Sequence, residues 1–283
     1  MKVLVTGAAG QLGTDVVAHL ASAGDDVVGV DRSALDITDT EDVDACVADV
    51  DPDAVINCAA FTAVDRCETE SELAHDVNEH GVRFLARACA KAGAHLVHIS
   101  TDYVFDGTLD RPYREDDPTN PMSVYGRSKL AGERAAVDIL GDATTIARTS
   151  WVCGEHGNNM VKLVWRLADD GAPMAFVDDQ RGCPSFTVDL APALRWLADR
   201  RPGGVVHVTN SGAVSWYEFV REILAASGYD PDLVAPIATT DLTPPRPAPR
   251  PANSVLDHVR WEVLGQPPLR DFRDPLRELV ARR

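Results

Sequence analysis

The sequence has little lysine and few aromatic residues, and none of its apolar runs is long enough to cross a membrane. Only four of the 27 basic residues are Lys, whereas 44 residues are acidic, so the formal net charge is −17 over 283 residues. A protein that binds nucleic-acid phosphates needs a basic surface, and anionic membranes repel negative charge. We therefore expect neither a nucleic acid nor a membrane as a partner.

The six Cys residues form no Cys-x-x-Cys pair and no Cys/His cluster at zinc-ligand spacing. In a chain of this length they indicate reduced, mostly buried thiols. Residues 1–7 leave no room for a secretory leader. We therefore expect a cytoplasmic protein, and the dispersed acidic residues with few Lys favour a halophilic one.

Enough apolar material is present for a large core, since 45% of the residues are hydrophobic. Short apolar runs, typical of strands covered on both faces, alternate with amphipathic stretches typical of helices. The runs lie at residues 2–6, 26–31, 54–59, 95–100, 144–149, 174–177 and 205–208. The amphipathic stretches lie at residues 12–23, 71–92, 189–200 and 215–226. This alternation predicts an α/β fold, a Rossmann-type doubly wound parallel sheet with a smaller mixed α/β lobe that binds substrate.

The regular alternation ends near residue 150, which suggests where the two parts divide. Residues 1–150 are expected to form the dinucleotide-binding Rossmann domain, with return segments near 174–210. Residues 151–173 and 211–283 are expected to form most of the substrate-binding lobe. The proline-rich stretch 243–251 is incompatible with a helix or a central strand, so we expect it to be an extended surface loop.

A glycine-rich turn follows the first predicted strand, where residues 6–13 read Thr-Gly-Ala-Ala-Gly-Gln-Leu-Gly. Glycines allow a tight turn and a close backbone approach to a pyrophosphate, whose charge the N-terminus of the next helix attracts. The strand–turn–helix context predicts a dinucleotide site. Its predicted residues are Gly7, Gly10, Gln11, Leu12 and Gly13.

The end of the second predicted strand bears on the choice of coenzyme. The carboxylate of Asp31 can accept hydrogen bonds from the adenosine ribose, which favours NADH. Arg32 follows at once and can hold the 2′-phosphate of NADPH instead, so both coenzymes stay open. Four further cofactor contacts are expected at Asp36, Ile37, Ala59 and Ala60.

Two more motifs carry chemistry. Tyr125 and Lys129 are four residues apart, so they share one face of a helix, and a nearby ammonium group stabilises a phenolate. This pair predicts a tyrosine that gives its proton to a developing alkoxide and a lysine that also holds the nicotinamide ribose. The hydroxyl-bearing pair Ser100-Thr101 ends the fourth predicted strand, where it can hydrogen-bond to a substrate carbonyl.

In this order the four motifs resemble the extended short-chain dehydrogenase/reductases. Neighbouring segments narrow the resemblance to the family of dTDP-4-dehydrorhamnose reductases, and it covers nearly the whole chain. These segments are residues 57–65, 100–107 (Ser-Thr-Asp-Tyr-Val-Phe-Asp-Gly), 125–133, 148–152, 157–159, 179–184 and 250–256. The resemblance implies NAD(P)H-dependent reduction of the 4-keto group of dTDP-4-dehydro-6-deoxy-L-mannose to dTDP-L-rhamnose.

The resemblance also implies roles for single residues. Thr101, Tyr125 and Lys129 match the family's catalytic residues. The residues implied on the substrate side are Val64, Asp65, Thr101, Asp102, Tyr103 and Trp151. Trp151 would pack on the sugar.

Some relatives are implied to form dimers bridged by magnesium on carboxylates. Asp15 and Asp189 fall at matching positions, but Asp is shorter than the usual Glu. We therefore assign no metal site and do not expect Mg²⁺, while a homodimer stays open.

Two alternative functions remain. One is another nucleotide-sugar enzyme of the extended short-chain family: a reductase for a different sugar, an epimerase or a 4,6-dehydratase. A dehydratase of this superfamily, however, has a Glu where Tyr103 stands. The other is a non-catalytic regulatory subunit of a methionine adenosyltransferase. Intact Thr101, Tyr125 and Lys129 favour an enzyme over the second alternative.

Overall fold

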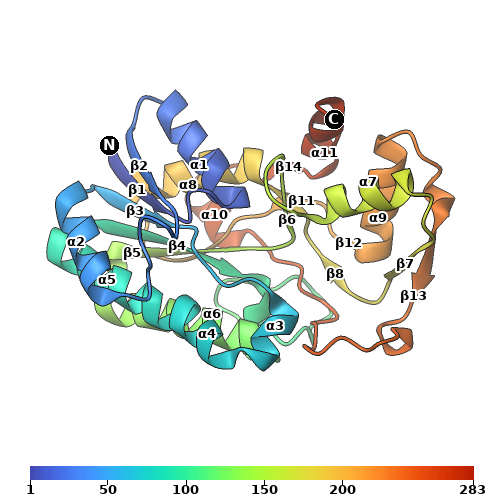
Figure 1. Ribbon diagram of the computed structural model, residues 1–283, viewed down its shortest axis with the longest axis horizontal. Coiled ribbons are helices and arrows are strands. Elements are labelled where there is room, and N and C mark those ends of the chain that lie inside the picture. The colour runs from blue at the N-terminus through green and yellow to red at the C-terminus, as the bar shows by residue number, and fades with distance from the viewer.

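A six-stranded parallel sheet forms the centre of one half of the molecule in the computed structural model, which describes residues 1–283 (Figure 1). Its strands are β1 (Lys2–Thr6), β2 (Asp26–Val30), β3 (Ala54–Asn57), β4 (His95–Thr101), β5 (Thr144–Thr149) and β10 (Gly204–His207). Their order is β10-β5-β4-β3-β1-β2, so the winding reverses between β1 and β3. In open sheets of this kind ligands bind beyond the carboxyl ends of the strands at such a reversal.

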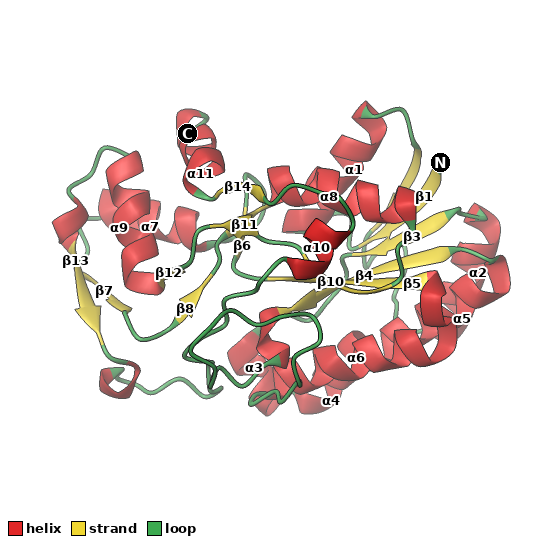
Figure 2. Cartoon of the chain, turned by 180° about the vertical axis from the view of Figure 1, so that it is seen from behind, coloured by secondary structure: helices red, strands yellow, loops and turns green.

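Helices cover both faces of this sheet, as Figures 1 and 2 show, and confirm the doubly wound fold. Val3 and Val5 of β1 pack in one core with α1 (Gln11–Ser22), α8 (Thr187–Arg200) and α10 (Val259–Val263). Leu4, which points to the opposite face, packs in a second core. The helices of that second core are α2 (Thr40–Val50), α5 (Gly81–Ala92) and α6 (Val124–Leu140). Burial on both faces explains why the strands are apolar throughout instead of alternating.

The amphipathic stretch 71–92 is not one regular helix. It consists of α4 (Ser71–His75), a π-helical turn at Asp76–His80 and α5, and it is preceded by the short α3 (Val64–Thr69). The π-helical turn places Asn78 under the loop after β3, where its side chain accepts from the Phe61 N–H and donates to the Phe61 carbonyl, at 2.9 and 3.0 Å. Such turns recur at functional sites because the extra residue redirects side chains.

A far lobe with its own core lies beyond the sheet. Its helices are α7 (Met160–Asp169), α9 (Trp216–Ala226) and α11 (Arg273–Ala281). Its strands form four short pairs: β6 (Val152–Cys153) with β9 (Ser185–Phe186), β7 (Met174–Val177) with β13 (Val234–Ile237), β8 (Arg181–Gly182) with β12 (Val214–Ser215), and β11 (Asn210–Ser211) with β14 (Leu269–Asp271). Short 3₁₀ turns lie at Asp102–Val104, Gly141–Ala143, Pro231–Leu233 and Thr239–Asp241.

One segment that we expected to return to the central sheet, residues 174–177, lies in the far lobe instead. Helix α8 and strand β10 return to the central sheet, whereas β7 pairs with β13 in the far lobe. The expectation for residues 174–177 was therefore wrong. The physical reason is that Met174, 5% exposed, packs in the core that α7 and α9 share.

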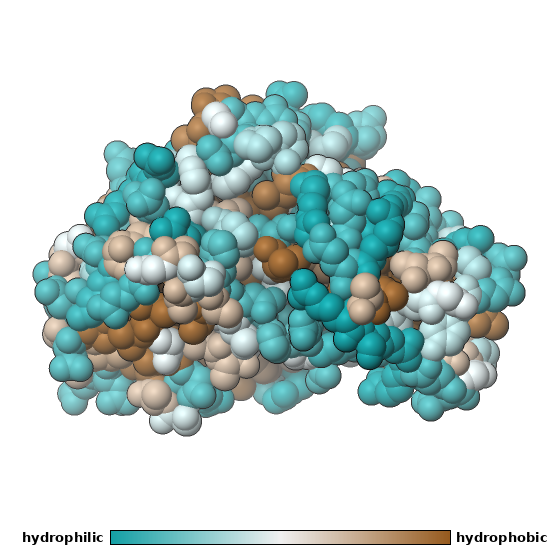
Figure 3. Space-filling view, turned by 90° about the horizontal axis from the view of Figure 1, so that it is seen from above, coloured by the Kyte–Doolittle hydropathy of each residue, from teal (hydrophilic) through white to brown (hydrophobic).

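One face of the molecule (Figure 3) shows how polar and apolar residues are distributed on the surface. Figure 3 shows a largely hydrophilic face on which apolar patches are interrupted by polar residues. No helix combines the length and the apolar character needed to cross a membrane.

Candidate active site

The glycine-rich turn lies at the reversal point of the sheet. Gly7 has a φ of +67°, and a Cβ at this position would lie 2.7 Å from the Ala59 nitrogen. A Cβ on Gly13 would come within 2.1 Å of the Gly7 carbonyl oxygen. The turn therefore needs glycine at both positions, and it presents bare backbone and the N-terminus of α1 beyond β1. This cradle fits the pyrophosphate of a dinucleotide.

The predicted turn residue Gln11 connects this cradle to the far lobe. Its side-chain amide donates to the Val152 carbonyl at 2.7 Å and accepts from the Asn159 amide at 3.2 Å. Leu12 is 9% exposed and packs in the core beneath the turn. Gly10 is the N-cap of α1.

The residues expected around the adenosine have different environments. The Asp31 carboxylate accepts from the Ser33 N–H and hydroxyl, and these bonds hold the pKa of Asp31 below its usual value. Arg32 is exposed, with its guanidinium 3.7 Å from the Asp36 carboxylate. Ile37 is 5% exposed and packs in the core against Gly81, so its side chain serves packing. A cofactor contact by Ile37 stays a prediction.

Thr101 and Tyr125 meet where β4 ends and α6 begins. Ser123 caps α6, and a Cβ on Gly126 would lie 2.2 Å from the Tyr103 carbonyl, so glycine lets the helix approach this segment closely. The Tyr125 ring contacts the Tyr103 ring edge-on, with centroids 5.5 Å apart. Burial raises the pKa of the Tyr125 phenol, and the Thr101 hydroxyl opposes this effect. The buried phenol is therefore protonated at neutral pH.

Lys129 lies one turn further along α6 and is 2% exposed. Its Nζ donates to the Ile99 carbonyl at 2.7 Å and lies 3.3 Å from His98 Nε2. Burial lowers the pKa of Lys129 to about 8, although the nearby Glu133 carboxylate favours the charged form. Burial of the phenol dominates the pKa of Tyr125, so the lowering expected from the Lys129 ammonium stays a prediction.

The substrate side of this site is polar and buried. The Thr101 hydroxyl donates to Asp102 Oδ1 at 2.9 Å, while Asp102 Oδ2 has no hydrogen-bond partner in the protein. Burial raises the pKa of Asp102 to about 6. Tyr103 follows in the same 3₁₀ turn, and Val64 begins the adjacent α3.

The proline-rich stretch lies against this side, which the sequence did not predict. Arg250 forms a two-pronged ion pair with Asp65, at 2.5 and 2.7 Å, so the charge of Asp65 is already matched. Arg246 is exposed and lies near Tyr103 and Asp65, and partial desolvation together with the neighbouring Arg250 lowers its pKa. Unlike Arg250, Arg246 forms no ion pair.

Trp151 lies where β5 gives way to the far lobe. It has a φ of +47°, a strained backbone for a bulky residue, and its ring stacks on Trp216 with centroids 3.5 Å apart. A Cβ on Gly182 would lie 2.5 Å from the Trp151 ring, so a glycine is required beneath the stack. Trp216 had no motif that could have marked it in the sequence.

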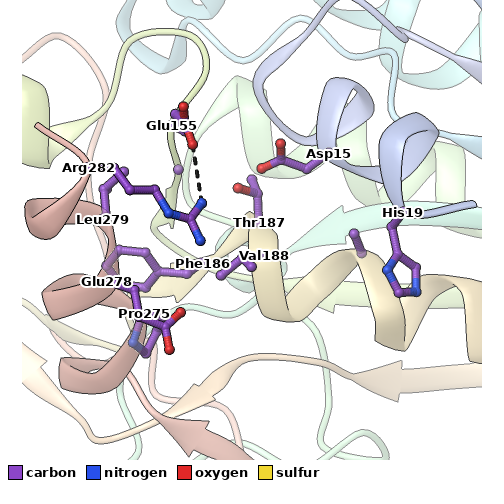
Figure 4. A pocket seen from close by; sticks show the side chains of 12 residues that line it. Asp15, His19, Glu155, Phe186, Thr187, Val188, Pro275, Glu278, Leu279 and Arg282 are labelled. Atoms are coloured by element: carbon purple, nitrogen blue, oxygen red, sulfur yellow. Dashed lines mark hydrogen bonds and ion pairs between the residues drawn. The ribbon is translucent and has the colours of Figure 1, made fainter. Parts of the chain in front are cut away.

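The residues present do not fit the bridging magnesium. Asp189 accepts from Arg270 Nε at 2.9 Å and from the Asn210 amide at 2.7 Å, so a resident guanidinium already pairs with its carboxylate. Asp15 faces His156 at 3.3 Å and lines a cavity of about 150 Å³ that Asp189 does not line (Figure 4). No three His, Cys, Asp or Glu side chains are grouped to hold a metal.

Comparison with known proteins identifies the family. The family model described as "RmlD substrate binding domain" matches residues 1–283. A "dTDP-4-dehydrorhamnose reductase" of Streptomyces griseus is 46% identical over 280 residues, which cover 97% of this chain and 91% of the relative. The chain belongs to the dTDP-4-dehydrorhamnose reductase family.

Two further similarities show the breadth of this reductase family. A "probable dTDP-4,6-dihydroxy-2-methyloxan-3-one 4-ketoreductase" of Streptomyces antibioticus is 43% identical over 281 residues, 98% of this chain and 94% of the relative. The solved dTDP-4-dehydrorhamnose reductase of Bacillus anthracis, in complex with NADP, has a TM-score of 0.95 and 35% identity, and each chain covers 100% of the other. The predicted reductase family and Rossmann-type fold are confirmed.

Proposed function

We propose that this protein reduces the 4-keto group of dTDP-4-dehydro-6-deoxy-L-mannose to give dTDP-L-rhamnose, with NADPH or NADH as the reductant. The observation that carries the proposal is the intact set of Thr101, Tyr125 and Lys129 at the carboxyl end of β4, on the same edge of the sheet as the glycine-rich turn. The chain is 46% identical to a named dTDP-4-dehydrorhamnose reductase. In this proposal the Rossmann domain, residues 1–150, binds the coenzyme. A lobe built mostly from residues 151–173 and 211–283 binds the substrate. Assembly as a homodimer stays a prediction.

The nicotinamide supplies the hydride when it is bound, with its pyrophosphate on the backbone of the glycine-rich turn. Tyr125 holds the proton that the new C4 alkoxide receives, because burial keeps the phenol protonated until a stronger base forms beside it. Thr101 orients the ketone oxygen toward the phenol when its hydroxyl hydrogen, which is donated to Asp102 in the protein alone, turns to the bound ketone. The buried walls around Tyr125 and Lys129 exclude water from the proton-transfer path.

The decisive experiment offers the purified protein dTDP-4-dehydro-6-deoxy-L-mannose with NADH and with NADPH separately. Loss of the reduced nicotinamide's absorbance, with formation of dTDP-L-rhamnose, is the expected result. The Streptomyces antibioticus relative favours a second candidate, reduction of another dTDP-linked 4-keto sugar. A preference for such a sugar would replace the proposed substrate, and no oxidation of coenzyme with any of them would contradict the proposed reaction.

The coenzyme is expected to be used without strong preference. Asp31 repels a 2′-phosphate, whereas the exposed Arg32 attracts it, and solvent screens both effects. We expect kcat/KM values for NADH and NADPH within about tenfold, or about 1.4 kcal/mol. Arg32→Ala should shift the ratio toward NADH, and Asp31→Ala should shift it toward NADPH. A thousandfold preference in the unaltered protein would show that one of the two side chains does not face the ribose.

Arg246 is expected to bind the diphosphate of the nucleotide sugar. It is a cation without an ion-pair partner, placed near Tyr103 and Asp65, and charge-assisted bonds to phosphate are among the strongest in proteins. We expect Arg246→Ala to raise KM for the nucleotide sugar about tenfold or more while kcat changes little. Arg200→Ala, which removes an exposed guanidinium beside Asp199, is the matched control. An unchanged KM would place the diphosphate elsewhere.

A further inference from the structure

The stacked rings of Trp151 and Trp216 lie at the edge of the proposed site. Thr149 of β5 pairs with Thr101 of β4, so Trp151 stands two positions beyond the residue beside Thr101. Its φ of +47° is unfavourable for a residue with a bulky side chain, and such a backbone persists only where its surroundings hold it. The contacts of Trp151 therefore decide where its ring lies.

Three groups of the far lobe surround the Trp151 ring. Trp216 covers one face, with the ring centroids 3.5 Å apart and the planes within 8° of parallel. The backbone of Gly182 lies so close to the ring that a Cβ there would come within 2.5 Å. Phe219, which is 0% exposed, lies beside both indoles, with centroid distances of 6.4 and 6.3 Å. Both tryptophans nevertheless stay partly exposed, so the pair reaches solvent and is not enclosed in the core.

Trp216 is itself held in place by the start of α9. It is the first residue of this helix, whose N-cap is Ser215. The Ser215 hydroxyl accepts from the Glu218 N–H at 3.0 Å, and the Glu218 carboxylate accepts from the Ser215 N–H at 2.7 Å. The strand β12 that leads into α9 also pairs with β8, which contains Gly182. The two groups nearest to the Trp151 ring are therefore fixed relative to each other.

We propose that Trp216 is a positioning residue that holds the plane of the Trp151 ring for packing against the sugar of the nucleotide sugar. The inference rests on the proposed function, in which Trp151 packs on that sugar. The C–H groups and the methyl group of a 6-deoxy sugar contact a flat indole over its full area only when the ring lies parallel to them. A free indole turns about two side-chain bonds, and the stack on Trp216 removes this freedom before the sugar binds.

Binding of the sugar can be measured separately from binding of the nucleotide. Calorimetric titrations of the full chain use dTDP-L-rhamnose as one probe and dTDP, which lacks the sugar, as the other. Replacing Trp216 by Leu leaves the Trp151 ring free to turn, so we expect Kd for dTDP-L-rhamnose to rise about tenfold while Kd for dTDP is unchanged. Trp216→Phe keeps a flat ring against Trp151 and should recover most of the affinity for dTDP-L-rhamnose.

A double-mutant cycle tests whether Trp216 acts through Trp151. Trp151→Leu removes the proposed sugar contact, so it should weaken binding of dTDP-L-rhamnose at least as much as Trp216→Leu does. In the Trp151→Leu background, Trp216→Leu should have no further effect on this affinity, because there is no longer a ring to position. Trp196→Leu is the matched control. This half-buried residue of α8 packs edge-on against Trp261, with centroids 5.2 Å apart, and its loss should leave both affinities unchanged.

An NMR measurement reports the environment of the Trp151 ring directly. The chain has five Trp and hence five indole N–H signals, and Trp151→Phe identifies the signal that belongs to Trp151. Stacking places this N–H in the ring current of the Trp216 indole, so we expect its signal to move in Trp216→Leu. In the unaltered protein the same signal should move when dTDP-L-rhamnose binds, and dTDP alone should not move it.

The proposal is overturned if Trp216→Leu raises Kd for dTDP and for dTDP-L-rhamnose by the same factor, if its effect adds to that of Trp151→Leu, or if the Trp151 signal stays in place. Should Trp216→Leu fail to fold, the unaltered protein still decides, because a Trp151 signal that responds equally to dTDP and dTDP-L-rhamnose overturns the proposal. None of these measurements needs turnover. A failed reductase assay together with a sugar-dependent loss of binding would therefore contradict the proposed reaction and leave the role of Trp216 intact.

Discussion

Replacing Tyr125 by Phe is expected to lower kcat at least about a hundredfold, the usual scale for losing a positioned acid. Phe keeps the ring contact with Tyr103 and removes only the hydroxyl that holds the proton for the alkoxide. Coenzyme affinity, measured by fluorescence titration with NADPH, should change little. The loss should therefore appear in turnover and in kcat/KM alike.

The matched control for this variant is Tyr217→Phe in α9. It removes a hydroxyl from a tyrosine that bonds Arg221 far from the sheet, so turnover should be unchanged. If Tyr125→Phe kept near-normal turnover, another group would have to supply the proton, and the assignment of Tyr125 would be wrong.

Replacing Glu133 by Ala is expected to destabilise the protein by about 3–5 kcal/mol, because it leaves a buried cation without a partner. Glu133 and Arg148 are 5% and 4% exposed as side chains, and they form two bonds at 2.9 and 2.7 Å. Glu133 also accepts from the Ser100 hydroxyl at 2.5 Å. Urea unfolding measured by circular dichroism gives the change in free energy of unfolding directly.

An exposed ion pair provides the comparison for Glu133. Glu70 pairs with Arg66 on the surface at 2.8 Å, and such pairs contribute about 0–1 kcal/mol, so Glu70→Ala should have a small effect. Because Ser100 precedes Thr101, Glu133→Ala should also reduce turnover in the fraction that remains folded. A destabilisation no larger than that of Glu70→Ala would mean that Arg148 finds another partner or water.

The elements that could be predicted from the sequence are those encoded within a few residues. The glycine-rich turn, the end of β4 and the Tyr125/Lys129 pair each combine a local motif with a strand or helix pattern. The parallel sheet then brings the carboxyl ends of β1 and β4 to one edge, and so the turn and Thr101 lie on the same side of the fold. Which of these residues touch cofactor or substrate stays a prediction.

What could not be predicted depends on contacts between distant segments. Arg250 reaches Asp65 across 185 positions, and nothing local to either residue marks the pairing. The stack of Trp151 on Trp216 likewise needs the far lobe to be folded. Likewise, the position of Ile37 after β2 does not indicate that its side chain packs in the core against the distant Gly81.

The bonds of Gln11 to Val152 and Asn159 couple binding at the coenzyme site to binding at the substrate site. Gln11 belongs to the glycine-rich turn and holds the segment that begins at Val152, directly after the strained Trp151. A ligand that orders the turn therefore restricts the motion of this segment, and a ligand that orders the segment restricts the turn. Coupling free energies are reciprocal, so the factor by which bound coenzyme changes the affinity for the nucleotide sugar equals the factor by which the sugar changes the affinity for coenzyme. The stacked Trp151 and Trp216 rings make this coupling measurable. The fluorescence of these two residues would change when either ligand binds, so one signal reports the affinity for both.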